Sequence, residues 1–113
     1  MSTNKPVGGA QFTPGPWYPH LAKADHCLSS SVWGAEPGNQ VAVIGGKSLQ
    51  TMNANATLIA AAPAMYEALR EAQELIRSLV AEEMIHSSEL QRVGNCQANM
   101  WQALSQAEGR HHE

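Results

Sequence analysis

The residues whose types are best suited to bind a ligand lie at Gly45-Gly46-Lys47-Ser48, where a β-branched run ends and a helical pattern begins. Backbone amides of a glycine-rich turn and of a following helix N-terminus near Thr51 can bind a phosphate group. A nucleotide-binding P-loop also needs a glycine five residues before its Gly-Lys pair, and Val41 occupies that position. The segment is therefore an ordinary strand-to-helix turn, which its local chemistry favours, or a small-anion site contacted by Lys47.

Two tryptophans and two asparagines are the other candidate recognition residues. Trp17 and Trp33 lie beside turn-forming segments, where an indole ring serves equally as a packing anchor or as a surface on which a ligand stacks. Asn53 and Asn55 begin a helical pattern, and asparagine is favoured at a helix N-cap over a helix interior. We expect one of the two asparagines to cap the helix and the other to offer its amide for recognition.

The sequence gives no support for a metal site or for catalysis. His20, His26 and Cys27 lack the paired spacing of structural zinc ligands, and we expect neither a metal nor a cofactor. His26 and Cys27 cannot form a dyad by adjacency, because neighbours on a strand point to opposite faces. Ser29–Ser31 has no nucleophile-elbow glycines. The chain is therefore predicted to bind and not to catalyse.

Composition narrows the class of partner and the setting. The chain has 113 residues, a net charge of −3 and no basic run, which disfavours duplex nucleic acid as a partner. The chain has neither an apolar run of membrane-spanning length nor a signal-peptide apolar region, so we expect a cytoplasmic protein with reduced cysteines. We expect a flexible leader over 1–12, a single domain over 13–107 and a disordered tail over 108–113.

A small antiparallel β-sheet is expected in the first half of the chain. Residues 17–21 are predicted to form a short edge strand, because Pro19 cannot donate to a central ladder. Residues 25–33 and 40–45 are predicted to form the next two strands, and residues 34–39 carry turn chemistry. In the second strand, Ser30 and Val32 should lie on the face opposite Ser31 and Trp33.

The second half of the chain is expected to be helical, which gives an α+β fold with two or three C-terminal helices. We predict helices over 51–62, from Pro63 to about Arg92, and over 96–107, with a break or kink at Gly94-Asn95. An apolar stripe at alternating spacings of three and four runs through Met65, Leu69, Ala72, Ile76 and Leu79. The stripe is either an internal core or a homodimer seam. Large core residues are few, so a core shared between subunits is a reasonable hypothesis.

Two passages of the chain resemble a group of small phage and prophage proteins. These proteins carry a TPGPW-like opening, here Thr13-Pro14-Gly15-Pro16-Trp17, and an N-A-x-L-I-A-A-A-P segment that runs into a helix, here within Asn53–Leu69. The general architecture, a small sheet followed by helices, is also similar to that of the type 1 Thoeris anti-defence proteins. The likeness to the phage and prophage proteins covers residues 13–69, and beyond them only helical character is shared.

The second resemblance implies a sponge, which binds a cyclic ADP-ribose-type or cyclic nucleotide immune signal of the Thoeris or CBASS type without cleaving it. It implies a homodimer or higher oligomer in the host cytoplasm. It also implies Asn53 or Asn55 as a base or ribose contact, Arg70 as a phosphate contact and Trp17 or Trp33 stacked on adenine. Lys47 at the glycine-rich turn would add a phosphate contact. The alternative is a phage inhibitor that binds a protein, such as an anti-CRISPR, through the Met-, Leu- and Trp-rich stripes at 65–79 and 100–104.

Overall fold

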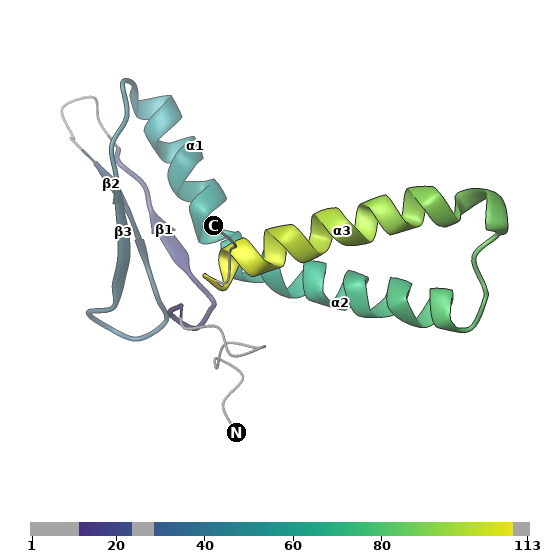
Figure 1. The fold of residues 1–113 in the computed structure, drawn as a ribbon. Helices are drawn as coiled ribbons and strands as arrows, with labels where there is room; N and C mark the ends of the chain where they lie inside the picture. Colours follow the sequence, from purple (N-terminus) through teal and green to yellow (C-terminus); the bar gives the residue numbers. More distant parts are fainter. Residues whose placement is uncertain (1–11, 24–28, 110–113) are drawn as a thin grey trace. The chain divides into compact units, whose positions relative to one another are not determined.

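The computed structural model describes residues 12–23 and 29–109, and it confirms the α+β fold class. A three-stranded antiparallel sheet is followed by three α-helices (Figure 1). The chain divides into two compact units, Met1–Met65 and Tyr66–Glu113. Two residues of the metal hypothesis, His26 and Cys27, and the start of the predicted second strand lie outside the described residues.

The sheet has the order β1-β2-β3, with β1 at Tyr18–His20, β2 at Ser30–Trp33 and β3 at Gln40–Ile44. The meander follows the prediction, and Pro19 lies in an edge strand, where its missing N–H is tolerated. The β2–β3 turn closes through a hydrogen bond of 2.8 Å from the Gly34 N–H to the Asn39 carbonyl. Gly38 in this turn has a φ of 79°, a conformation that glycine adopts without steric cost.

The core of the first unit lies between the sheet and helix α1, Leu49–Ala60, which packs along one face of the sheet (Figure 1). Ala56 is fully buried, and its small side chain lets the helix backbone approach the sheet closely. The helix begins at Leu49 because the Ser48 side chain caps it, accepting the Thr51 N–H at 3.1 Å. The prediction that an asparagine caps this helix is therefore wrong, and the helix begins two residues before the predicted start at Thr51.

The Thr13–Trp17 turn packs against the junction of α1 and the next helix. A side chain at Gly15 would place its Cβ 2.8 Å from the Cβ of Pro63, so only glycine fits there. The Trp17 indole N–H donates to the Thr13 carbonyl at 3.0 Å, and its ring meets Phe12 edge-on with 6.4 Å between ring centroids. The two sequence passages that carry the phage resemblance therefore touch each other in the fold, which gives a physical reason for their pairing.

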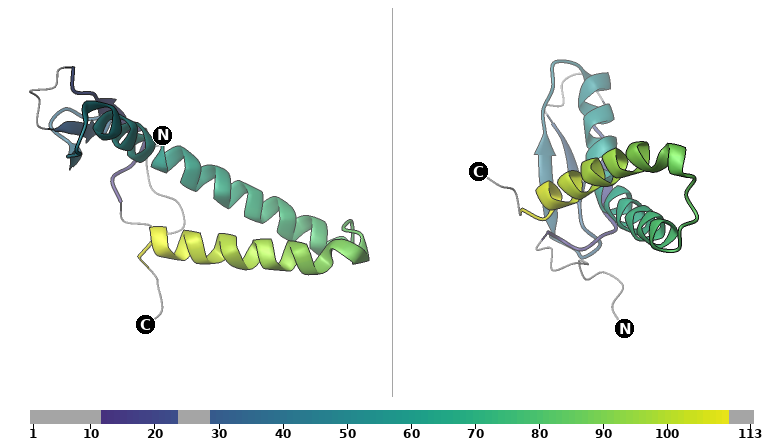
Figure 2. Two further views of the ribbon diagram at one scale, coloured as in Figure 1. Left: turned by 90° about the horizontal axis from the view of Figure 1, so that it is seen from above. Right: turned by 45° about the vertical axis from the view of Figure 1, so that its right-hand side comes forward.

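The second unit is built from helix α2, Ala62–Ala81, a short 3₁₀ helix η1, Ser87–Glu89, and helix α3, Leu90–Ala107. The helices α2 and α3 run antiparallel as a hairpin (Figures 1 and 2). The predicted helix to Arg92 and the predicted break at Gly94 are both wrong. The chain turns at residues 82–86, and α3 runs unbroken through Gly94.

The end of α2 explains why the turn falls where it does. Glu83 has a φ of 57°, the Glu83 N–H donates to the Val80 carbonyl at 3.1 Å, and the Met84 N–H donates to the Leu79 carbonyl at 2.9 Å. These two bonds are those of a Schellman motif, which usually carries glycine at the left-handed position. The glycine that normally marks such a helix end is absent here, so the end of α2 cannot be recognised from the sequence pattern.

Glu83→Gly is expected to raise the free energy of unfolding by about 0.5–1 kcal/mol. The left-handed conformation costs a residue with a β-carbon about 1–2 kcal/mol, and glycine avoids this cost. Glycine also loses more conformational entropy on folding, which offsets part of the gain. Chemical denaturation of the two proteins measures the difference. A loss of stability would contradict the left-handed conformation of this residue.

Candidate functional site

The face of the sheet opposite α1 carries most of the aromatic side chains of the sheet. Strand register places Tyr18 beside Trp33, and His20 and Val43 on either side of Ser31. We call this surface the aromatic face: Tyr18, His20, Ser31, Trp33 and Val43. Tyr18 is 50 % exposed and Val43 60 %, whereas Ser30 and Val32 on the other face of β2 are buried. The predicted alternation of β2 is confirmed for these residues.

Two rings of the aromatic face are held in a fixed arrangement. The His20 and Trp33 rings stack with 5.7 Å between their centroids and 29° between their planes. The Trp33 indole N–H donates to the Ser31 hydroxyl at 2.8 Å, which satisfies the polar atom of the indole and fixes its orientation. The result is an ordered aromatic surface, of the kind on which a nucleobase can stack.

Asn53 has a structural role in the first unit. Its amide oxygen accepts the Ala22 N–H at 2.9 Å and the Ser30 hydroxyl at 2.5 Å, and its amide nitrogen donates to the Ala22 carbonyl at 2.9 Å. The side chain thus hydrogen-bonds both backbone groups of Ala22, as a neighbouring strand would. It joins α1 to the segment that follows β1 through these three hydrogen bonds.

The other predicted ligand residues lie at separate places in the structure. Trp17 packs against the core cluster of the first unit, so its ring serves as a packing anchor. Asn55 is exposed on α1, and Lys47 is exposed in the turn before α1. A Cβ at Gly46 would lie 3.2 Å from the Met52 backbone nitrogen, so this turn packs against the first turn of the helix. Of the predicted set, Trp33 alone belongs to the aromatic face.

Arg70 belongs to a polar cluster in the second unit. Its guanidinium lies 3.6 Å from a carboxylate oxygen of Glu108, and the Tyr66 hydroxyl donates to the same oxygen. The Glu108 side chain is only 2 % exposed, although the sequence placed this residue in a disordered tail. The cluster connects the first turns of α2 to the end of α3, and Arg70 is already paired with an anion of the protein itself.

The cluster raises the pKa of Tyr66 above its ordinary value of 10.0, first through burial and then through the hydrogen bond to Glu108 and its negative charge. A tyrosine whose pKa is higher in the folded than in the unfolded state contributes its full stabilisation below about pH 10. This contribution to the free energy of unfolding is lost as the pH rises through the pKa of the folded state. We therefore expect alkaline destabilisation above about pH 10 that Tyr66→Phe reduces. Tyrosinate absorbance titrations of both proteins measure it, and a Tyr66 midpoint at or below 10 would contradict the burial.

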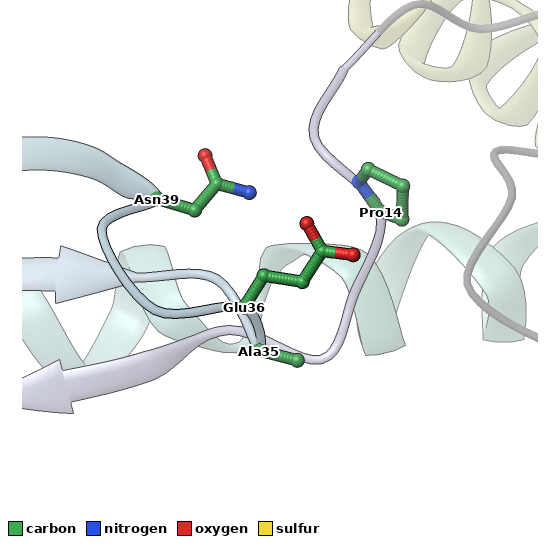
Figure 3. Close-up of a pocket in the computed structure, with 4 residues that line it drawn as sticks. All are labelled: Pro14, Ala35, Glu36 and Asn39. Atoms are coloured by element: carbon green, nitrogen blue, oxygen red, sulfur yellow. The ribbon is translucent and has the colours of Figure 1, made fainter.

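A shallow depression of about 70 Å³ lies at the β2–β3 turn. It is lined by Pro14, Ala35, Glu36 and Asn39 (Figure 3). Figure 3 shows Glu36 and Asn39 on one side and Pro14 across from them. Drug-sized ligands occupy pockets of roughly 300–1,000 Å³, so this depression is too small for a nucleotide.

Neither a metal cluster nor a membrane span is found in the described part of the chain. Across residues 12–23 and 29–109, His, Cys, Asp and Glu do not gather in groups of three or more that could hold a metal ion. None of the described helices is long and apolar enough to cross a membrane.

Sequence comparison places the chain among phage proteins. Residues 1–111 match the family described as Salmonella phage P22 protein Y8K6, and the chain belongs to that family. No curated protein and no solved structure shows significant similarity to the chain. The expected membership of a phage protein family is confirmed, and the similarity to the Thoeris anti-defence proteins stays a prediction.

Sequence reasoning missed part of the aromatic face and the partners of Arg70. Alternation along Tyr18-Pro19-His20 would have placed Tyr18 and His20 on one face, and antiparallel pairing would have set them beside Trp33. The burial of Glu108 gave no local signal, because the residue follows the last turn of a helix and precedes a glycine.

Proposed function

We propose that this phage protein is a non-catalytic binding protein of the counter-defence type, which sequesters a cyclic nucleotide or cyclic ADP-ribose-type immune signal. The observation that carries the proposal is the fixed stack of His20 and Trp33 on the aromatic face, at 5.7 Å between ring centroids. Each base that stacks on an aromatic side chain contributes about 1–3 kcal/mol to the binding free energy, and any of the bases can stack in this way. The class of ligand comes from the resemblance to the sponge proteins.

The energetics favour a ligand with two bases or with charged phosphates. A dissociation constant below 1 μM needs more than about 8 kcal/mol, which one stacked base cannot supply. Charge-assisted hydrogen bonds add about 1.5–3 kcal/mol each. Lys23 and Lys47 are exposed in the described part of the first unit.

The polar groups of the aromatic face support binding over catalysis. The Ser31 hydroxyl accepts the Trp33 indole N–H, and the His20 ring lies against the same indole. A nucleophile would need a general base within hydrogen-bond reach. The Ser31 and His20 side chains instead hold the Trp33 ring in place, and a sponge requires such a fixed stacking surface.

The proposal is tested by recovery of an intact ligand. The purified protein is incubated with cyclic ADP-ribose isomers and with cyclic di- and trinucleotides, separated from free ligand, and denatured by heat. We expect one class of ligand to be retained and released unchanged. Release of a cleaved product would identify an enzyme, and retention of no ligand across the panel would refute the sponge.

A second candidate function is inhibition of a protein partner through the helices. Three large apolar side chains of the second unit are well exposed, with Leu75 at 60 %, Met84 at 66 % and Trp101 at 49 %. Interfaces are rich in such aromatic and Met residues. A protein that retains no panel member would favour this candidate.

A further inference from the structure

The Trp33 ring leans toward one end of the aromatic face. Its indole N–H donates at 2.8 Å to the hydroxyl of Ser31, which lies two residues earlier on β2. The indole also stacks on His20, which the strand register pairs with Ser31. Side chains two residues apart on a strand share a face and stand one behind the other. The indole therefore leans from its own row toward the row of His20 and Ser31.

Tyr18 presents a separate ring in the row that the indole leaves. The strand register pairs Tyr18 with Trp33, and Tyr18 is 50 % exposed. In the described part of the chain, the Tyr18 ring contacts no other ring and its hydroxyl has no hydrogen-bond partner. A tyrosine ring offers an apolar surface for stacking and a polar tip for a hydrogen bond. The aromatic face therefore has two stacking surfaces, the His20–Trp33 pair and Tyr18.

The strand geometry sets the spacing of these two surfaces. The rows of Tyr18 and His20 are two residues apart on β1, and Cα atoms with that separation lie about 6.6 Å apart. Stacked bases of one nucleic-acid strand are only about 3.4 Å apart. A base stacked on the His20–Trp33 pair therefore leaves the Tyr18 ring uncovered. A second base of the same ligand, splayed away from the first, can stack on Tyr18.

The charge of the aromatic face is compatible with a phosphodiester that links two bases. The five side chains that define this face include no carboxylate. A carboxylate among them would face the phosphate as a like charge, which strongly disfavours binding. The stacking surfaces can therefore take two bases without placing the linking phosphate against an acidic side chain of the face.

We propose that the ligand of the aromatic face carries two bases, one stacked on the His20–Trp33 pair and the other on Tyr18. This inference rests on the function proposed above and narrows its ligand to the cyclic dinucleotides, which carry two bases. The cyclic ADP-ribose type carries one base and uses only one of the two surfaces. Tyr18 is then the residue that distinguishes the two classes of ligand.

The second base adds affinity because it belongs to the same molecule as the first. Each base stacked on an aromatic side chain is worth about 5- to 150-fold in affinity. Once the first base is bound, the second meets its ring at a high effective concentration. A ligand with two bases therefore gains this factor twice, and a ligand with one base gains it once.

The test compares two ligands that differ in the number of nucleotide units. Cyclic di-AMP has two adenines, and 3′,5′-cyclic AMP has one. Adenine serves as the probe because stacking accepts any base. Isothermal titration of the full chain should show cyclic di-AMP binding about 5- to 150-fold more tightly than cyclic AMP. Equal affinity for the two ligands would overturn the inference and leave the proposed function standing.

Tyr18→Ala is expected to remove the preference for two bases. Its affinity for cyclic di-AMP should fall by about 5- to 150-fold, and its affinity for cyclic AMP should not change. Trp33→Ala should weaken the binding of both ligands. Tyr18→Phe keeps the ring and should bind both ligands as the wild type does. Circular dichroism checks that each variant is folded.

Two results with Tyr18→Ala would overturn the inference alone. Wild-type affinity for cyclic di-AMP would show that no base stacks on Tyr18, and equal losses for both ligands would assign Tyr18 a structural role. Tyr18→Thr repeats the test if the alanine variant folds poorly, because threonine favours strands. A wild type that binds neither probe and no member of the ligand panel would refute the proposed function and this inference together.

Discussion

Asn53→Ala is expected to lower the free energy of unfolding by about 3 kcal/mol. The substitution removes three hydrogen bonds, to the N–H and the carbonyl of Ala22 and to the Ser30 hydroxyl. Each is worth roughly 1 kcal/mol net, and a buried group left without a partner costs more. Ser30 is 2 % exposed, so water does not replace the lost bond. Chemical denaturation followed by circular dichroism measures the change.

Asn55→Ala is the matched control, because Asn55 is exposed on the same helix two residues away. Alanine has the higher helix propensity, so the variant should be equally stable or about 0.5 kcal/mol more stable. The contrast between the two asparagines separates a structural amide from a solvent-exposed one. Equal losses at both positions would contradict the assigned role of Asn53.

Arg70→Ala is expected to lower the free energy of unfolding by about 2–3 kcal/mol. The change leaves the buried Glu108 carboxylate with its Tyr66 hydrogen bond but without the cation at 3.6 Å. Removing one partner of a fully buried pair costs about 3–5 kcal/mol, and the 31 % exposure of the Arg70 side chain reduces that cost. Thermal and chemical unfolding of the variant measure it.

Two comparisons isolate the charge effect. Arg77→Ala removes an exposed arginine two turns further along α2 and should change stability by less than about 0.5 kcal/mol. Adding Glu108→Gln to Arg70→Ala removes the buried negative charge as well and should recover part of the loss. A double variant less stable than Arg70→Ala alone would show that the carboxylate needs no counter-charge.

The sheet was predictable because its signals are local. Turn residues at 34–39 and the β-branched run of β3 define the meander, and alternation assigns the faces of β2. The residues of α1 were also helical as predicted, but its N-cap was misassigned. Ser48 and Asn53 are both good capping residues, and only tertiary contacts show that the Asn53 amide is engaged by Ala22.

The helical hairpin shows where local signals mislead. Gly94 has the residue type of a helix break, but it lies in open space within α3, where a helical glycine costs only about 1 kcal/mol. Glu83 has the residue type of a helix interior, yet it takes the left-handed position at the end of α2. Propensity is a weak prior at both positions.

The candidate site was only partly readable for a related reason. Trp33 was identified by its residue type and by its place beside a turn, but its partner His20 depends on strand pairing. Arg70 was identified as a cation for a phosphate, whereas the structure pairs it with Glu108, 38 residues away in the sequence. Partners so distant in sequence leave no periodic pattern from which they could be predicted.

The proposed platform is tested most directly by the affinity of a Trp33→Ala variant for the ligand that the wild type retains. Isothermal titration should show a loss of about 5- to 150-fold, which corresponds to the 1–3 kcal/mol of one stacked base. Trp33→Phe keeps an aromatic ring and should lose less, and Leu58→Ala, an exposed position on α1, should lose nothing. A folded Trp33→Ala variant with wild-type affinity would contradict the account.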